Sequence, residues 1–394
     1  MAAWVYRAHS QECDAAKFGL VPGAGDSSAA LTRVLGACAG RLIRLAPGTY
    51  SFRPAGYAQG FSLPDGTTLQ GARADLPSPT VFEIADSGSF ASLLWIRNAS
   101  RVSVRDIRFE GSKFDSGCAR HLDYGHAITL YSDRGSAASI EGVALSGNVF
   151  HNFNGLSWVT LNAQDGSPGI GMNSAIAIEK NSFKSDANLV GGCADREIGY
   201  SVAMVSLHGS DESGHGLIEN VSISSNEFDA RFVKQAVAIW SGAARCTVEN
   251  NEIMGAGLNL PAATGELGRY AIVVYNSAHE KPGLFPSDIR IAGNRIVNPV
   301  SCGIYAASAR RLEISGNRIS GQIDRNDVTL PKGAIALNHV DDARVSGNDI
   351  QNSHIGISVV AGTVRMEGNI IAAPAGGIRT KIYRSDGAPA EIQK

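Results

Sequence analysis

The chain is poor in aromatic and in charged residues, and these shortages narrow the classes of protein to consider. Aromatic residues make up 7% and charged residues 18% of its 394 residues. The formal net charge is −2, so we expect neither nucleic acid nor a membrane surface as its partner. No apolar run is long enough to span a bilayer, and residues 1–10 hold no long apolar segment of the kind found in secretory signals.

Cysteine is scarce too, and its spacing is uninformative for metals. The six cysteines show no Cys-x-x-Cys spacing, so we predict no zinc site. No dense cluster of acidic residues indicates calcium, and we predict no metal and no cofactor. Cys118 and Cys193 both fall in long expected loops and can pair, which the sequence alone leaves open.

A short sequence motif repeats along most of the chain. An apolar strand, a small turn and a second strand lead to Asn-x-Ile or Asn-x-Phe. The asparagines of this motif are Asn148, Asn181, Asn226, Asn251, Asn294, Asn317, Asn348 and Asn369. Self-similarity of this kind predicts a solenoid, in which each repeat buries its apolar face only against its neighbours. The repeats are short runs of β-formers without helical periodicity, so we predict coils made of strands.

The repeated asparagine has a specific predicted role. A tight bend between two strands needs a residue that tolerates a left-handed or bridging backbone. The side-chain amide both donates and accepts hydrogen bonds, so stacked asparagines can bond to the turns above and below. We therefore expect these asparagines to form an internal ladder along the solenoid.

The N-terminal part predicts a cap for the solenoid. Asp26 and Ser27 are candidate N-cap residues, and Leu31, Val34 and Leu35 lie on one face of the helix that follows. Such a helix would cover the open end of the coil, where strand edges would otherwise pair with another molecule.

The entrance at residues 18–50 and the asparagine-bearing coils together carry a resemblance. They resemble the pectate-lyase superfamily of right-handed parallel β-helices, which includes pectate and alginate lyases, polygalacturonases, inulin fructotransferases and phage tailspike depolymerases. The resemblance covers about residues 17–375. It implies an all-β fold, namely a single-stranded right-handed parallel β-helix with an N-terminal capping helix.

The resemblance also implies expectations about organisation and partners. A poly- or oligosaccharide is the expected partner, the location is expected to be secreted or periplasmic, and a homotrimer is an open alternative. The expected parts are an N-terminal segment with the capping helix and first coils (1–92), the parallel β-helix (93–379) and a C-terminal tail (380–394).

One strand of each coil is expected to present side chains outward along a single face. Strand alternation directs one set inward, namely Ile128, Leu130, Val159, Leu161, Val237, Ile239, Ile272, Val274, Ile335 and Leu337. It places an outward column at Tyr131, Asn162, Trp240, Tyr275, Tyr305 and Asn338. Ring faces suit the C–H surfaces of sugars, while phenol and indole tips bond to hydroxyls. We predict a stacking platform for a linear glycan, with substrate-binding residues Tyr131, Asn162, Arg231, Trp240, Tyr270, Tyr275 and Tyr305. The alternative is that loops cover this face and bury the rings as a second core.

Candidate catalytic residues gather in the loops beside these strands. The segment that begins at His208 contains Asp211 and Glu212. Glycoside hydrolysis needs two carboxylates, one as acid and one as base or nucleophile. Because adjacent side chains diverge, a partner must come from another coil. Candidates for that partner are Glu197, Asp195 and Asp165. The alternative is that residues 211 and 212 form a solvated loop tip.

A lyase would use cations in addition. A base removes the proton next to a uronate carboxylate, and a cation neutralises that carboxylate. Arg231 and Lys234 precede one outward-facing strand, and Arg245 follows it. Alternatively, these cations are surface ion-pair partners of Asp229 and Glu227.

The sequence thus predicts a carbohydrate-active enzyme that cleaves glycosidic bonds by carboxylate acid/base chemistry. The catalytic candidates are Glu197, His208, Asp211, Glu212, Lys234 and Arg245. Lyase activity on a uronate-containing glycan, fructotransferase-like intramolecular transfer and non-catalytic glycan binding of the tailspike or adhesion kind stay open as alternatives.

Overall fold

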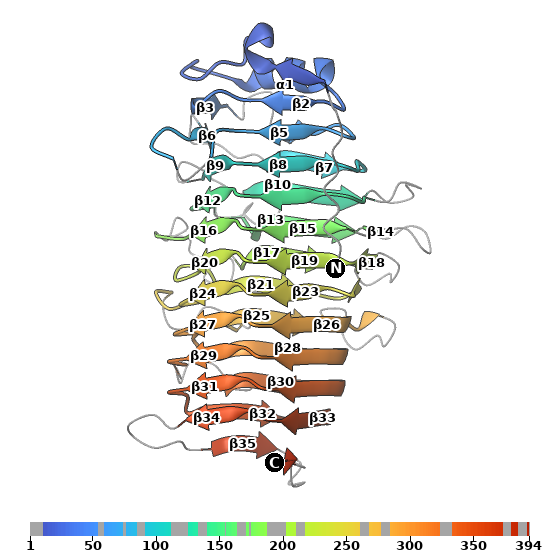
Figure 1. Cartoon of the computed structure of the whole chain (residues 1–394), viewed down its shortest axis with the longest axis vertical. Helices are drawn as coiled ribbons and strands as arrows, with labels where there is room; N and C mark the ends of the chain where they lie inside the picture. The colour runs from blue at the N-terminus through green and yellow to red at the C-terminus, as the bar shows by residue number, and fades with distance from the viewer. Residues whose placement is uncertain are drawn as a thin grey trace, which may run out of the picture.

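The chain winds as a parallel β-helix whose coils stack along one long axis (Figure 1). The computed structural model describes residues 11–53, 59–73, 76–84, 91–111, 125–132, 140–153, 155–163, 171–172, 175–186, 202–209, 217–260, 268–276, 284–323, 333–372, 380–384 and 392–393.

The coils build two parallel sheets. Within the described residues, one sheet has 25 strands and the other has 11. A typical early coil contributes β10 and β11 to the larger sheet and β12 to the smaller one. In two later coils the strands of the larger sheet merge into the 14-residue strands β28 and β30.

The strands of the smaller sheet are β3 (Gly48–Phe52), β6 (Thr80–Ile84), β9 (Ile107–Glu110), β12 (Val149–His151), β16 (Ser182–Lys184), β20 (Glu227–Asp229), β24 (Glu252–Met254), β27 (Arg295–Val297), β29 (Arg318–Ser320), β31 (Asp349–Gln351) and β34 (Ile370–Ala372). The strands of the larger sheet are β1 (Glu12–Asp14), β2 (Leu42–Arg44), β4 (Phe61–Ser62), β5 (Thr68–Gln70), β7 (Ser92–Arg97), β8 (Ser103–Arg105), β10 (His126–Ser132), β11 (Ala144–Ser146), β13 (Ser157–Ala163), β14 (Gly171–Met172), β15 (Ile176–Glu179), β17 (Ala203–His208), β18 (Leu217–Glu219), β19 (Val221–Ser224), β21 (Gln235–Ile239), β22 (Ala243–Ala244), β23 (Thr247–Glu249), β25 (Tyr270–Tyr275), β26 (Ser287–Ala292), β28 (Cys302–Ser315), β30 (Gly333–Ser346), β32 (Ile355–Val359), β33 (Gly362–Glu367), β35 (Thr380–Arg384) and β36 (Ile392–Gln393).

A ladder of asparagine side chains stands at the bend that precedes eight strands of the smaller sheet. It contains all eight predicted asparagines, from Asn148 to Asn369. At each step Nδ2 donates to Oδ1 of the next asparagine at 2.9–3.1 Å, and the backbone N–H donates to the same oxygen. Nδ2 also donates to a backbone carbonyl of the preceding coil, as from Asn181 to Leu145 at 2.9 Å. The predicted ladder is confirmed.

The left-handed residue of this bend stands one position earlier than expected. The values of φ are +66° at Gly147, +56° at Lys180 and +56° at Ser225, which immediately precede three ladder asparagines. The expectation that the ladder asparagine itself adopts this conformation is wrong. The ladder asparagine follows that residue and lies directly before the strand, where its N–H donates along the axis to the asparagine of the next coil.

The interior is a continuous stack of apolar side chains. Phe109, Phe150, Phe183 and Phe228 follow one another on successive coils, with ring centroids 4.7–5.1 Å apart and planes within 14° of parallel. The ten residues predicted to point inward are all fully buried. Alternation in the strands therefore specifies the core as the sequence indicated.

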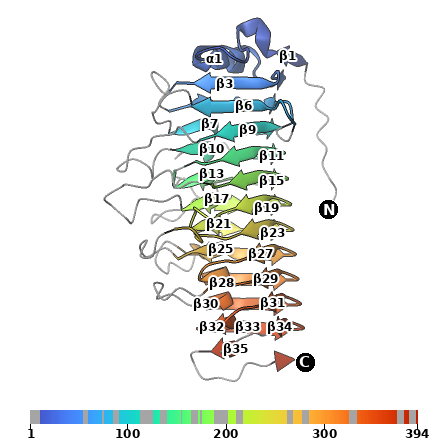
Figure 2. The same ribbon diagram turned by 90° about the vertical axis from the view of Figure 1, so that its left-hand side faces the viewer.

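A cap covers the N-terminal end of the stack (Figures 1 and 2). It consists of the 3-10 helix η1 (Ala15–Phe18) and the helix α1 (Ser28–Ala37), whose Leu31, Val34 and Leu35 are buried as predicted. The Asp26 carboxylate accepts the N–H of Ser28 at 2.9 Å. A disulfide between Cys13 and Cys38 ties β1 to the end of α1.

The remaining expectations about organisation have mixed outcomes. β35 pairs with β32 and β36 pairs with β33, so the expected tail at 380–394 contains strands of the larger sheet, which corrects that part of the division. Cys118 and Cys193 lie outside the described residues, and Cys246 and Cys302 are buried. Within the part of the chain that is described, no helix has the length and apolarity to cross a membrane.

Candidate functional site

The outward face of the larger sheet carries one column of partly exposed polar and aromatic side chains. Paired positions on neighbouring coils place Arg97, Tyr131, Asn162 and His208 in line. The N–H of Trp240 donates to the Leu207 carbonyl at 2.8 Å, which puts Trp240 beside His208. The column continues through Tyr275 and Ala307 to Asn338. We call the partly exposed stretch from Arg97 to Tyr275 the outward column.

Ring contacts fix the side chains of this column relative to one another. The His208 ring stands edge-on to Trp240, with centroids 5.3 Å apart and planes at 88°. Tyr131 meets Trp95 edge-on at 5.7 Å, and the Arg97 guanidinium lies 5.6 Å from the Tyr131 ring. These contacts fix the orientation of the rings, and Tyr131, His208 and Trp240 are partly exposed.

Tyr305 belongs to a different column. It pairs with Val273 and Ala336, two residues before the positions of Tyr275 and Asn338, so the prediction that it shares their column is wrong. It is 6% exposed and stacks on Tyr270, which is 2% exposed, with centroids 4.7 Å apart. Burial raises the pKa of both phenols.

These two tyrosines are part of a second apolar cluster on the outward face of the larger sheet. Its members are Ala203, Ala238, Tyr270, Val273, Cys302, Tyr305, Ala307 and Ala336, with Trp240 and Tyr275 packed against it. The outward face is therefore covered at Tyr270 and Tyr305 and partly open at Trp240 and Tyr275. The alternative of a second core holds for Tyr270 and Tyr305, whereas the glycan platform stays a prediction for Trp240 and Tyr275.

Buried polar groups accompany this cluster. Lys234 is 1% and Arg269 is 2% exposed, and Arg269 Nη1 donates to the Gly257 and Leu260 carbonyls at 3.3 Å. The side-chain oxygens of Gln235 and Tyr270 are buried and have no hydrogen-bond partner among the residues that the structure describes. Lys234 was predicted to contact substrate as a catalytic cation, but it is buried and is not exposed at the surface.

Two arginines predicted for the site are engaged elsewhere. Arg231 forms a two-pronged ion pair with Asp229, at 2.7 and 2.6 Å, which is the ion-pair alternative stated for it. Arg245 lies at a left-handed corner between β22 and β23, where it pairs with Glu219 at 2.6 Å and donates to Asn220 at 3.1 Å. Arg245 is thus not brought to the outward column.

The predicted carboxylates cannot be placed. Glu197, Asp211 and Glu212, and the alternative partners Asp165 and Asp195, lie outside the described residues. His208 is the one catalytic candidate that the described residues place within the outward column. In the described ranges, no three His, Cys, Asp or Glu side chains are grouped so as to hold a metal ion.

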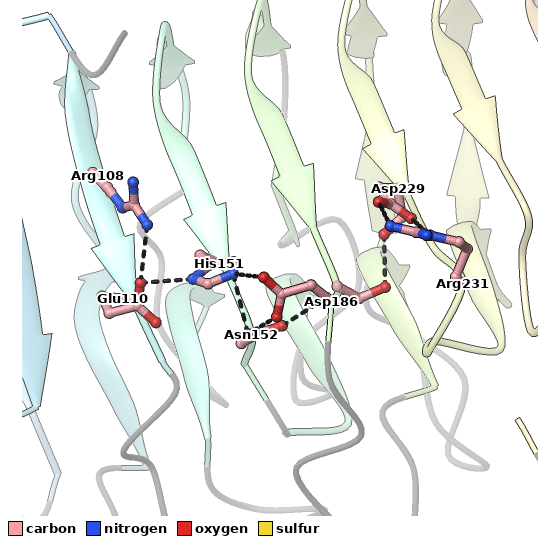
Figure 3. Close-up of polar contacts among 8 residues, drawn as sticks. Arg108, Glu110, His151, Asn152, Asp186, Asp229 and Arg231 are labelled. Atoms are coloured by element: carbon pink, nitrogen blue, oxygen red, sulfur yellow. Dashed lines mark hydrogen bonds and ion pairs between the residues drawn. The ribbon is translucent and has the colours of Figure 1, made fainter. Parts of the chain in front are cut away.

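A charged column that the sequence reasoning missed runs along the outer surface of the smaller sheet. Glu110, His151, Lys184 and Asp229 occupy equivalent positions on β9, β12, β16 and β20. Figure 3 shows His151 between Glu110 and Asp186. Nδ1 of His151 lies 2.6 Å from Oε2 of Glu110, and Nε2 lies 2.7 Å from Oδ2 of Asp186. A signal was present in the sequence, because each of the four residues directly follows a phenylalanine of the core stack.

A shallow depression lies away from both columns, outside the bend of the asparagine ladder. Its volume is about 390 Å³, and its lining includes Arg73, Asp106, Lys180, Ser182, Ser225 and Glu227. Asp106, Lys180 and Ser225 are left-handed corners, and Ser182 and Glu227 are the first residues of smaller-sheet strands. The lining holds two cations, Arg73 and Lys180, and two carboxylates, Asp106 and Glu227, so the depression has no single charge preference.

Comparisons with known proteins agree with this architecture. Residues 235–386 match the family model described as a right handed beta helix region. Among curated proteins, none matches the sequence. The chain is similar in structure to a surface adhesin of Streptococcus pneumoniae, at 12% identity and a TM-score of 0.54, over 98% of this chain and 96% of that one. It is also similar to the A-module of a mannuronan C-5 epimerase from Azotobacter vinelandii, at 14% identity and a TM-score of 0.51, over 96% of each chain.

A third similar structure is an alginate lyase from Paenibacillus sp., at 14% identity and a TM-score of 0.50, over 97% of this chain and 98% of that one. Identities this low establish shared fold rather than shared chemistry. The chain is a right-handed parallel β-helix protein, and the fold predicted from the sequence is confirmed. At the level of fold, the resemblance to the pectate-lyase type of β-helix holds.

Proposed function

We propose that this protein binds a linear poly- or oligosaccharide along the outward column and cleaves its glycosidic bonds. One observation carries the proposal: Tyr131, Trp240 and Tyr275 are partly exposed on one rigid face, with Asn162 and His208 between them. Neighbouring coils repeat at about 4.8 Å, so the column offers closely spaced contacts along an extended ligand. Partly exposed rings and polar tips suit the two kinds of surface that a sugar presents.

For the chemistry, we propose a pair of carboxylates acting beside His208. Glu197, Asp211 and Glu212 are the candidates, with one as acid and its partner as base or nucleophile. Elimination on a uronate-containing glycan is the alternative within the enzyme class, and the exposed Arg97 at the end of the column is the cation that would favour an acidic substrate. Fructosyl transfer remains a third proposal.

A non-catalytic glycan-binding role is the second candidate. The burial of Lys234 and Tyr270 favours it, because one catalytic candidate and one substrate-binding candidate are withdrawn from the surface. The likeness to a surface adhesin fits the same role at the level of fold. Stacking alone would then account for the outward column.

Digestion of a panel of plant, algal and microbial glycans distinguishes these functions. New reducing ends without ultraviolet absorbance of an unsaturated uronate indicate hydrolysis, and the appearance of that absorbance indicates elimination. Binding without either product indicates an adhesion role. If the protein neither binds nor alters any glycan of the panel, the proposal fails.

Substitution in the outward column tests where the glycan binds. Trp240→Ala and Tyr131→Ala should each weaken binding of a panel glycan about 5- to 50-fold, because each removes a stacking surface. The matched control is Ile370→Ala on β34, since Ile370 is 65% exposed but lies on the smaller sheet. Equal loss in the control, measured by calorimetry, would contradict the placement.

Location and assembly are part of the proposal. The disulfide between Cys13 and Cys38 supports a secreted or periplasmic location, because such bonds persist in oxidising compartments. A homotrimer remains a prediction, and light scattering of the purified protein measures it directly.

A further inference from the structure

His151 uses both of its ring nitrogens at once. Nδ1 lies 2.6 Å from Oε2 of Glu110, and Nε2 lies 2.7 Å from Oδ2 of Asp186 (Figure 3). An ionised carboxylate only accepts hydrogen bonds, and a neutral imidazole has only one N–H to donate. Two such contacts therefore require the doubly protonated, cationic ring.

The two carboxylates are held ready for this cation by other residues. Arg108 Nη2 donates to Oε2 of Glu110 at 3.3 Å, and the Asp186 N–H donates to Oδ1 of Asn152 at 3.0 Å. The Asn152 amide nitrogen in turn donates to the Asp186 carboxylate. The side chains of His151 and Glu110 are 15% and 18% exposed, whereas that of Asp186 is 60% exposed.

Asn152 makes a second arrangement available. Its amide nitrogen lies 3.1 Å from Nε2 of His151, as well as within bonding distance of Asp186. A neutral ring that keeps its proton on Nδ1, facing the better-buried Glu110, has a lone pair on Nε2. That lone pair repels the Asp186 carboxylate and can accept a hydrogen bond from Asn152.

We propose that His151 is a pH-operated clamp across three coils. The cationic ring bonds to both Glu110 and Asp186, whereas the neutral ring releases Asp186 and accepts a hydrogen bond from Asn152 at Nε2. The clamp ties the ends of β9 and β12 to the residues that follow β16. Ser185, next to Asp186, donates to the Asp229 carbonyl at 2.7 Å, so release at Asp186 loosens the point where this coil leaves the smaller sheet.

The charges around the ring act in both directions. The hydrogen bond to Glu110 raises the pKa of His151, burial lowers it, and the bond to Asp186 raises it, with a net upward shift. Lys184 on β16 and Arg108 on β9 are the cations nearby that oppose a charged ring, while Asp229 and Arg231 on the β20 side neutralise each other. The pKa of Asp186 is lowered, first by its bond from Asn152 and, against burial, also by its bond from His151.

The direction of the pH dependence follows from the raised pKa. The clamp is fully formed below the ordinary histidine pKa of about 6.5. It is lost as the pH rises through the higher pKa of the folded protein. Acidification therefore tightens this region and mild alkalinity loosens it.

Nitrogen-15 NMR of the imidazole groups in the full chain tests the clamp, with His151 assigned by the signal lost in His151→Gln. We expect both His151 nitrogens to be protonated at pH 6 and to titrate above the ordinary histidine pKa of about 6.5. Asp186→Asn should lower the His151 titration midpoint toward that ordinary value. Hydrogen exchange at residues 184–186, corrected for its intrinsic pH dependence, should accelerate across the His151 midpoint in the wild type and should show no such step in His151→Gln.

A neutral His151 ring at pH 6 would overturn the proposal, because a carboxyl group would then hold the proton. A His151 midpoint at or below the ordinary histidine value of about 6.5 would overturn it as well. If His151→Gln does not fold, the wild-type titration and the Asp186→Asn variant still decide the question. The test needs no glycan, so its outcome is independent of the proposed sugar chemistry.

Discussion

The two ends of the strands in the smaller sheet stack polar side chains on successive coils in different ways. At the entry, identical asparagines repeat on coil after coil, and each amide donates to the asparagine of the next coil while accepting from that of the preceding coil. At the exit, Glu83, Glu110, His151, Lys184 and Asp229 follow one another, so two carboxylates are neighbours before the charge alternates from coil to coil. A neutral group that both donates and accepts can repeat in register, whereas like charges directly opposite each other repel. The first end is uniform, whereas the second changes its residue type from Glu110 onward and is sensitive to pH.

The strongest test of the comparison removes one rung of the ladder. Asn251→Ala deletes an amide that is 1% exposed and leaves the Asn226 donors and the Ile223 carbonyl without a partner. The free energy of unfolding should fall by about 3 kcal/mol or more, since buried unpaired polar groups cost about 1–3 kcal/mol each. The loss should be the same at pH 5 and pH 8, as measured by denaturant unfolding.

The adjacent residue supplies the control for that variant. Asn250 is exposed and has φ of +56°, a conformation that glycine adopts freely. Asn250→Gly should change stability by less than about 1 kcal/mol. Equal losses at 250 and 251 would show that the bend, rather than the ladder, stabilises this part of the coil.

The exit column should contribute a smaller, pH-dependent stability. Relative to His151→Gln, the wild type should be more stable by about 1 kcal/mol below pH 6.5, after a discount because Asp186 is largely solvent-exposed. The advantage should vanish as the pH rises through the raised pKa of His151. Thermal unfolding of both proteins from pH 5 to 9 measures the difference, and parallel curves would contradict it.

The smallest expected effect comes from disturbing the sequence of charges. Lys184 stands between His151 and Asp229, and Lys184→Glu would place two carboxylates side by side. We expect a loss of about 0.5 kcal/mol relative to Lys184→Gln, which removes the charge without reversing it. Salt at about 1 M should erase the difference, since the Debye length is then about 3 Å.

The sequence was sufficient for the repeating parts of the fold. The ladder from Asn148 to Asn369, the inward set of the strands and the capping helix all recur or alternate at spacings that a single sequence displays. The left-handed position was assigned one residue late because asparagine is permitted in both places, and only the hydrogen bonds along the axis decide between them.

The site was harder to predict because it depends on register across coils. Tyr305 and Tyr275 are both tyrosines near strand ends, but pairing shifts one of them by two residues into a covered column. The burial of Lys234 and the pairing of Arg231 with Asp229 depend on neighbours that local spacing does not reveal. The contacts of His151 could not be predicted from the sequence, because its two partners lie 41 and 35 residues away in the chain.

The asparagine ladder also gives the molecule an electrical direction. All of its side-chain amides point the same way, from Ile107, whose N–H donates to Asn148, toward Asn369. Aligned amides polarise one another and add their dipoles, as peptide groups do along a helix axis. The stacked amides thus add a net dipole along the axis of the coils, with its oxygen end toward the N-terminal cap and its N–H end toward the C-terminal coils.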